Sequence, residues 1–386
     1  MQITHNEPGN HTMISRGPLN ERRVESVRSV PGGVERIGHY GNWASVQRPM
    51  VGRPGYVQRT VFSRGGTYSV VYHSYAYHGV TLFSPVPAVM FAPAYYGFLL
   101  TPWAASVAYS PAVWGWPGQP WYQAYGPAFT PYPVYGGPDQ WLTDYLISNN
   151  LQHAYESQPQ NGQPIIGAPV IGEEEKALID QDVRAELERQ RQFAENPTPD
   201  QSPAPPMPAR SGGGNASLQQ PSSPPDVPEQ VPEALKDHIF SVYVAPLEVQ
   251  QVSGETCTLT EGDLIFRSGE VLNSDKTVDV IVRKSHASEK HPEYCAPQTH
   301  TRVALNDLQE MHNRKQELMA EGLKKHADLM GKSLPKGPAP HPTQVARGQV
   351  DPDTAAAVAD LKQLMQDADK TEREVSVVGA TGTTTN

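Results

Sequence analysis

The sequence lacks the motifs that usually identify an enzyme. It contains no G-x-S-x-G elbow, no phosphate-cradling glycine loop, no H-E-x-x-H and no C-x-x-C. Catalysis also needs a concave site on a rigid scaffold, and the composition described below favours small modules. We therefore predict that the protein is not an enzyme and that it has no cofactor.

Apolar residues are scarce for a chain of this length. Hydrophobic residues make up 38% of the 386 positions, while 38 are proline and 32 are glycine. This composition favours small folded modules joined by flexible segments over one large core. The net charge of -10 argues against a nucleic-acid partner, because phosphate binding needs clustered Lys and Arg.

The first residues lack the apolar segment of a secretory signal. Met1 to Asn20 is polar, and residues 1–54 mix scattered arginines with Gly-Pro breaks. We predict that residues 1–54 are disordered. Two locations stay open: the protein is cytoplasmic, or its true start lies upstream and it reaches the periplasm or cell envelope.

Charge is absent from a long internal stretch, since no Asp, Glu, Lys or Arg lies between Arg64 and Asp139. The stretch follows a run of β-branched and aromatic residues at 56–62, and alternating tyrosines continue to Tyr77. A third short run occupies 80–83. The pattern predicts a small β-meander of two or three strands that needs a second layer.

The second layer is predicted to be an irregular module rich in aromatic residues, proline and glycine. Proline recurs too densely between 85 and 133 for a regular helix or a central strand. Exposed aromatic patches usually mark contact surfaces, so we take Trp103, Trp114, Trp116, Trp121 and Tyr122 as the candidate binding surface. A packed module without a ligand and a peripheral contact with a membrane stay open as alternatives.

Helical patterns and a linker follow. A helix opening at Asp139 closes the aromatic module, which spans 55–157, and an isolated helix is predicted over 173–195. The segment 196–233 is rich in Pro, Ser and Gln, which is typical of a disordered linker. The chain is therefore predicted to be bipartite.

A second folded unit is predicted over 234–332. Five short strands with alternating apolar residues, followed by a helix, indicate a small β-barrel. The segment Leu259-Thr260-Glu261-Gly262-Asp263-Leu264-Ile265 resembles a turn of bacterial SH3-like modules. Residues 333–386 form a Pro-rich tail with a short helix. The predicted fold is thus mostly β, with a few helices and extensive disorder.

The only two cysteines, Cys257 and Cys295, lie in this second unit. A small domain gains stability from a disulfide, so we take them as a candidate pair, and a bond would imply an oxidising compartment. The alternative is two buried thiols. His286, His291, Cys295 and His300 also crowd one loop, but their spacing fits no standard zinc motif, so we predict no metal site and keep metal binding only as a weaker alternative.

The order of these segments resembles a set of uncharacterised bacterial envelope-type proteins. The resemblance rests on the Tyr-rich meander, the block Gly115-Trp116-Pro117-Gly118-Gln119-Pro120-Trp121-Tyr122 and the small C-terminal barrel. The resemblance carries no known activity. We predict a scaffold or adhesion protein of the envelope that binds a polymer, a surface or another protein through the aromatic block and the small barrel. A cytoplasmic protein–protein adaptor and a metal-binding protein are the alternatives. The oligomeric state is not predicted.

Overall fold

The computed structural model describes most of the chain. The described residues are 2–7, 9–16, 22–40, 43–63, 66–157, 170–196, 230–243, 246–269, 271–289, 291–345, 348 and 354–381. Most of the predicted linker at 196–233 lies outside them. Among the described residues 37% are helical and 35% are in strands, so the fold is mixed rather than mostly β.

The N-terminal part forms an eight-stranded antiparallel sheet in which each strand pairs with the next along the chain. Its strands are β1 (Gln2–Glu7), β2 (Asn10–Arg16), β3 (Arg22–Val30), β4 (Gly33–Tyr40), β5 (Trp43–Pro49), β6 (Tyr56–Ser63), β7 (Gly66–Tyr77) and β8 (Val80–Val86). The predicted meander corresponds to β6–β8 and is confirmed. The prediction of disorder in 1–54 is wrong, because five strands lie there.

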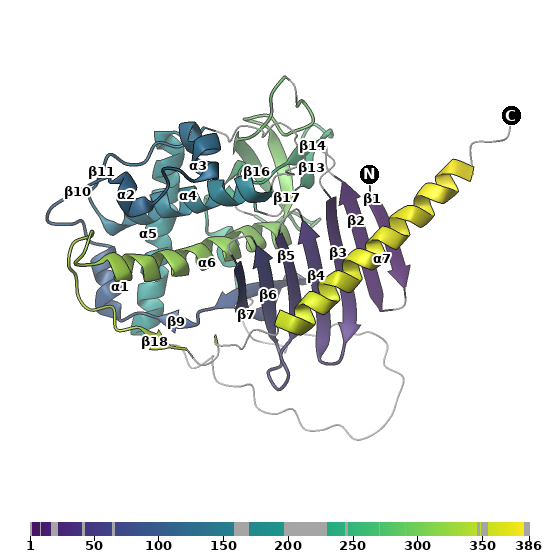
Figure 1. Ribbon diagram of the computed structural model, residues 1–386, viewed down its shortest axis with the longest axis horizontal. Coiled ribbons are helices and arrows are strands. Elements are labelled where there is room, and N and C mark those ends of the chain that lie inside the picture. The colour runs from purple at the N-terminus through teal and green to yellow at the C-terminus, as the bar shows by residue number, and fades with distance from the viewer. Residues whose placement is uncertain are drawn as a thin grey trace.

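Those five strands are stabilised by a helix from the far end of the chain. Helix α7 (Thr354–Thr381) crosses β3, β4 and β5 diagonally (Figure 1). It places Leu364 and Ala368 in a buried cluster with Val24, Ile37 and Val46. Ion pairs flank the cluster, including Arg22 with Asp369 at 2.7 Å. Local sequence gave no sign of this partner, and α7 is much longer than the short helix predicted for the tail.

The opposite face of the sheet packs against helix α6 (Leu305–Leu329). Arg59 on β6 pairs with Glu310, with Nη1 to Oε2 at 2.5 Å. Farther along α6, Glu317 accepts hydrogen bonds from the hydroxyls of Tyr68 and Tyr72. These buried polar contacts fix the position of α6 across the sheet, because neither partner can be withdrawn without leaving a charge or hydroxyl unpaired.

The aromatic block folds into short helices around one long helix. Its elements are β9 (Val89–Met90), α1 (Pro93–Leu99), β10 (Val107–Ala108), α2 (Pro111–Trp114), α3 (Pro120–Tyr125), η1 (Gly126–Ala128), β11 (Val134–Tyr135) and α4 (Pro138–Ser157). Proline occupies the start of α1, α2 and α3, where its missing N–H is tolerated. The irregular backbone predicted for this block therefore contains several one- and two-turn helices.

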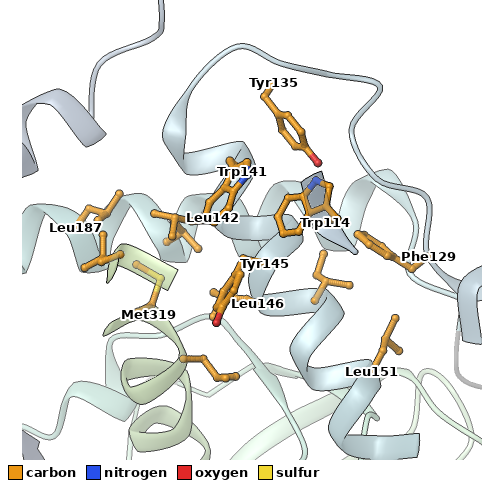
Figure 2. Close-up of a cluster of buried hydrophobic side chains, with 14 of the residues drawn as sticks. Trp114, Phe129, Tyr135, Trp141, Leu142, Tyr145, Leu146, Leu151, Leu187 and Met319 are labelled. Carbon is orange, nitrogen blue, oxygen red and sulfur yellow. The ribbon is translucent and has the colours of Figure 1, made fainter. Parts of the chain in front are cut away.

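Helix α4 carries the centre of this core. Trp141, Leu142 and Leu146 on α4 are buried, and Figure 2 shows them among Trp114, Phe129 and Met319. Helix α5 (Glu173–Glu195) has the predicted bounds. It is not isolated, however, because it packs on α1 and α4 and buries Val183 and Leu187.

The C-terminal unit contains a six-stranded antiparallel sheet. After η3 (Glu233–Leu235), the strands are β12 (Ile239–Ser241), β13 (Leu247–Gln251), β14 (Thr256–Leu259), β15 (Leu264–Arg267), β16 (Thr277–Lys284) and β17 (His300–Ala304), in the spatial order β12-β15-β16-β17-β13-β14. The SH3-like character stays a prediction. The two predicted units are in direct contact, since α6 packs on the first sheet and on α4, and β18 (Thr343–Gln344) pairs with β9.

Candidate functional site

The main cavity lies between the N-terminal sheet and the beginning of α6. It has a volume of about 300 Å³, and side chains from β3, β4, β5, β6, β8 and α6 line it together with Tyr243. Its mouth includes the exposed residues Arg36, Thr81 and Asn306. The volume is at the lower end of the roughly 300–1,000 Å³ range of small-molecule sites.

Strand alternation places the lining residues. Arg23 and Glu25 on β3 face the cavity, while Val24 between them faces α7. The pairing of β3 with β4 places Tyr40 beside Arg23. The pairing of β4 with β5 then places Trp43 beside Tyr40. The same period-two pattern that buries valines under α7 thus directs charged and aromatic side chains to the other face.

Six charged side chains, three positive and three negative, line the cavity. They are the guanidinium groups of Arg23, Arg36 and Arg59 and the carboxyl groups of Glu25, Glu310 and Asp307. Arg23 Nη2 lies 2.5 Å from Glu25 Oε1, and Arg59 Nη1 lies 2.5 Å from Glu310 Oε2. The formal charge of the lining is therefore balanced when all six groups are ionised.

Three buried side-chain nitrogens of the cavity are unsatisfied within the described residues: His39 Nδ1, which can donate or accept, and the N–H donors of Gln47 and Trp43. Gln47 is 2% exposed, and its Oε1 accepts from Arg59 Nε at 3.0 Å and Nη2 at 2.8 Å, which leaves Nε2 as the free donor. The indole Nε1 of Trp43 likewise has no partner among these residues. Because a buried donor without a partner costs about 1–3 kcal/mol, both groups are suited to a ligand or to ordered water.

Two further groups set the electrostatics of the site. The guanidinium carbon of Arg36 lies 5.5 Å from the ring centroid of Phe83, and Arg36 forms no ion pair with any described residue. Burial raises the pKa of the Asp307 carboxyl to about 6, with Glu25 and Glu310 adding to the shift and Arg23 opposing it. Asp307 therefore changes charge in the slightly acidic range.

The predicted tryptophan surface is mostly interior. Trp103, Trp114, Trp116 and Trp121 are between 3% and 8% exposed, while Tyr122 is half-buried. The Trp114 ring stacks on Trp116 at 4.4 Å and on Trp141 at 4.9 Å between centroids. The expectation of an exposed aromatic patch is therefore corrected at the four tryptophans, of which Trp114, Trp116 and Trp121 pack together and Trp103 stacks on His326 of α6.

Three of these tryptophans also form the floor of a groove of about 230 Å³. Trp114, Trp116 and Trp121 line it together with Gln119, which precedes α3, and with polar residues from α4 and α6, namely Ser148, Asn149, Gln152 and Lys325. Lys325 Nζ lies 5.7 Å from the Trp114 ring centroid, and burial lowers the pKa of Lys325. A binding role for this groove stays a prediction.

The two cysteines are bonded as predicted. The Sγ atoms of Cys257 and Cys295 are 2.05 Å apart, and both residues are buried. Bonded in this way, Cys295 cannot serve as a thiolate ligand for a metal.

The histidines of the same loop have separate surroundings. His286 is buried with Nδ1 2.7 Å from Asp263 Oδ1, His291 Nδ1 lies 3.1 Å from Glu293 Oε1, and His300 is exposed on β17. Within the described ranges, no three His, Cys, Asp or Glu side chains are grouped so that they could hold a metal ion.

The comparisons with known proteins give no relative for this chain. No protein-family model, no curated protein and no solved structure matches it. In the part of the chain that the structure describes, no helix has both the length and the apolar character needed to cross a membrane. The resemblance to envelope-type proteins accordingly stays a prediction.

Sequence reasoning missed every residue of the main cavity. The signal was present in residues 22–30, where Arg22-Arg23-Val24-Glu25-Ser26-Val27-Arg28-Ser29-Val30 places valines among charged and polar residues, and Pro31-Gly32-Gly33 supplies a turn. Its charge density led to the interpretation of disorder, because the helices that cover both faces of the sheet lie more than 250 residues away.

Proposed function

We propose that the protein is a non-enzymatic scaffold or adhesion protein of the bacterial cell envelope, which holds its partner in the cavity between the N-terminal sheet and α6. The observation that carries this proposal is the presence of two buried donors, on Gln47 and Trp43, that have no partner in the part of the chain that the structure describes and lie beside a charge-balanced and partly aromatic lining. Binding sites typically combine apolar walls with a few convergent polar groups of this kind.

The surrounding structure supports a binding role, because it holds the lining rigidly. Arg59 is fixed by Glu310 and Gln47 and lies over the ring of Tyr72 at 4.3 Å. The cavity is thus built from strands and a helix rather than from loops, and such a site loses little entropy when a ligand binds. The aromatic block and the six-stranded C-terminal sheet are two further packed units, and they can serve as spacers.

The disulfide supports the proposed location. Disulfides persist in secreted and periplasmic proteins and are rare where thiols are kept reduced. Labelling of thiols in intact cells, with and without a reductant, tests this point. We expect Cys257 and Cys295 to react only after reduction; labelling without reductant would favour a cytoplasmic adaptor instead.

The binding role is tested with the envelope fraction of the source cells. Purified full-length protein is expected to sediment with this fraction, and Trp43→Phe and Arg36→Ala together are expected to reduce the bound amount about tenfold or more. Trp103→Phe is the matched control, since Trp103 Nε1 is also buried and unsatisfied within the described residues but lies in the aromatic core. Equal sedimentation of all variants would contradict the proposal.

A further inference from the structure

The charge balance of the main cavity limits what it can bind. An anionic ligand would meet the carboxyl groups of Glu25, Glu310 and Asp307, and a cation would meet three guanidinium groups. Neither sign is favoured, because each charge of one sign is matched by one of the other in the same lining. A neutral ligand avoids the desolvation and repulsion that either ion would experience.

The polar groups of the cavity are both donors and acceptors in a small space. Trp43 Nε1 and Gln47 Nε2 are unsatisfied donors within the described residues, and the carboxylate of Asp307 forms no hydrogen bond or ion pair with any of those residues. A hydroxyl group donates one hydrogen bond and accepts up to two, so a ligand rich in hydroxyls can satisfy all three side chains at once. A ligand with acceptors alone would leave the carboxylate unpaired.

The remaining wall is apolar and partly aromatic. Tyr40, Trp43, Leu82 and Phe83 contribute to the lining, and Leu82 is 1% exposed. Aromatic rings offer a flat apolar surface with polar edges, which complements a ring-shaped ligand that has C–H groups on its face and hydroxyls at its edge. Sugar rings have this distribution of groups.

We infer that the cavity binds a neutral, hydroxyl-rich segment of a glycan, with the sugar ring against the aromatic wall and its hydroxyls on Trp43, Gln47 and Asp307. This inference rests on the proposed function and names the chemistry of the partner. The exposed mouth at Arg36, Thr81 and Asn306 leaves room for the rest of a polymer to continue into solvent.

Calorimetric titration of the full-length protein tests the inference. The probes are short oligomers of glucose, galactose and N-acetylglucosamine, matched oligomers of galacturonic acid, and inorganic phosphate. We expect at least one neutral oligomer to bind, to bind more tightly than the acidic oligomer or phosphate, and to do so equally at low and high salt, because no net charge is involved.

Substitutions localise the binding to the cavity. Trp43→Phe removes one donor and keeps most of the ring, and Asp307→Asn keeps the size of the side chain; each is expected to weaken binding of the neutral oligomer roughly tenfold. Trp103→Phe should leave the affinity unchanged. Thermal unfolding of each variant confirms that it is folded, and Asp307→Asn removes a charge whose burial is unfavourable, so it should fold at neutral pH.

The outcomes separate the ligand class from the site. If no neutral oligomer binds, or if binding survives in Trp43→Phe and Asp307→Asn, the glycan inference is wrong. If sedimentation with the envelope fraction depends on Trp43 but only phosphate or the acidic oligomer competes with it, the ligand class is wrong and the proposed function stands. If neither sedimentation nor titration depends on the cavity, both proposals fail.

Discussion

Neither the aromatic block nor the N-terminal sheet has the role that its sequence predicts. The block contains most of the tryptophans and has no charged residue before Asp139, as a sticky surface would, yet its five tryptophans are buried in one core. The sheet begins with a polar, arginine-rich segment typical of disorder, yet it forms one wall of the cavity beside α6. Aromatic rings that are close together in the chain can bury one another. Charged strands need oppositely charged or hydrogen-bonding partners, which here come from the distant helices α6 and α7.

The comparison also shows how differently the two regions are stabilised. In the aromatic block the contacts are ring against ring and ring against α4, so stability depends on shape and volume (Figure 2). In the sheet, ion pairs and tyrosine hydroxyls contribute to the contacts with α6 and α7, beside a small apolar cluster under α7. Substitutions should therefore separate the two regions by the size of their effects and by their dependence on pH and salt.

The largest effect is expected in the aromatic core. Trp141 is 1% exposed, and Trp141→Ala should lower the free energy of unfolding by about 3–5 kcal/mol, because it leaves a cavity beside Trp114 and Tyr145. Urea unfolding measures the change. Trp43→Ala, at a half-buried position in the sheet, is the control and should have a clearly smaller effect; equal effects would remove the distinction between the two regions.

A glycine in α6 tests how tightly the aromatic core is packed. Gly322 lies against α4, and a Cβ atom there would be 2.9 Å from Tyr145 Cδ1 and 3.0 Å from Leu142 Cδ2. Helix propensity alone predicts that Gly322→Ala stabilises the protein by about 1 kcal/mol, but overpacking should reverse the sign and destabilise it by about 1–3 kcal/mol. The midpoint temperature of thermal unfolding decides between stabilisation and destabilisation. A higher midpoint for Gly322→Ala would show that α4 and α6 are loosely packed.

A buried carboxyl in the aromatic block should make its stability depend on pH. Burial raises the pKa of Asp144 to about 7, although its Oδ2 accepts from the Tyr132 N–H and the Tyr135 hydroxyl. The ionised form is disfavoured in the folded state, so the penalty is absent near pH 4, grows as the pH rises and is full above about pH 7. Asp144→Asn should thus gain about 1–2 kcal/mol at about pH 8 and almost nothing at about pH 4.

The matching variant in the main cavity is Asp307→Asn. The pKa of Asp307 is raised to about 6, so its gain in stability should begin near pH 4, as for Asp144→Asn, but reach its full and smaller size about one pH unit lower. Unfolding curves recorded across the pH range compare the two. A gain for either variant that does not change with pH would indicate that the carboxyl group is not the cause.

The smallest effect is expected where α7 meets the sheet. Asp369 pairs with Arg22 at 2.7 Å but is about half exposed, so Asp369→Ala should cost only about 0.2–1 kcal/mol and less as salt is added. Lys370→Ala is the control, because its partner Glu374 lies on the same helix. A loss of several kcal/mol would mean that the ion pairs, rather than Leu364 and Ala368, hold α7 in place.

Much of the secondary structure could be predicted where a local pattern sufficed. The strands β6–β8 and the helix α5 follow from alternation, helical spacing and the acidic first turn of the helix. The disulfide followed from there being only two cysteines. The cavity could not be predicted, because Asp307 and Glu310 meet Arg23 and Arg59 only after α6 has packed on the sheet.

The sequence by itself determined the local elements, since periodicity, proline positions and the absence of charge act over a few residues. The tertiary structure alone decided which surfaces are covered: α7 and α6 close the two faces of a polar sheet, and tryptophans pack around α4 in one core (Figure 2). Burial depends on contacts between residues far apart in the chain, and no local pattern states which distant segment will make them.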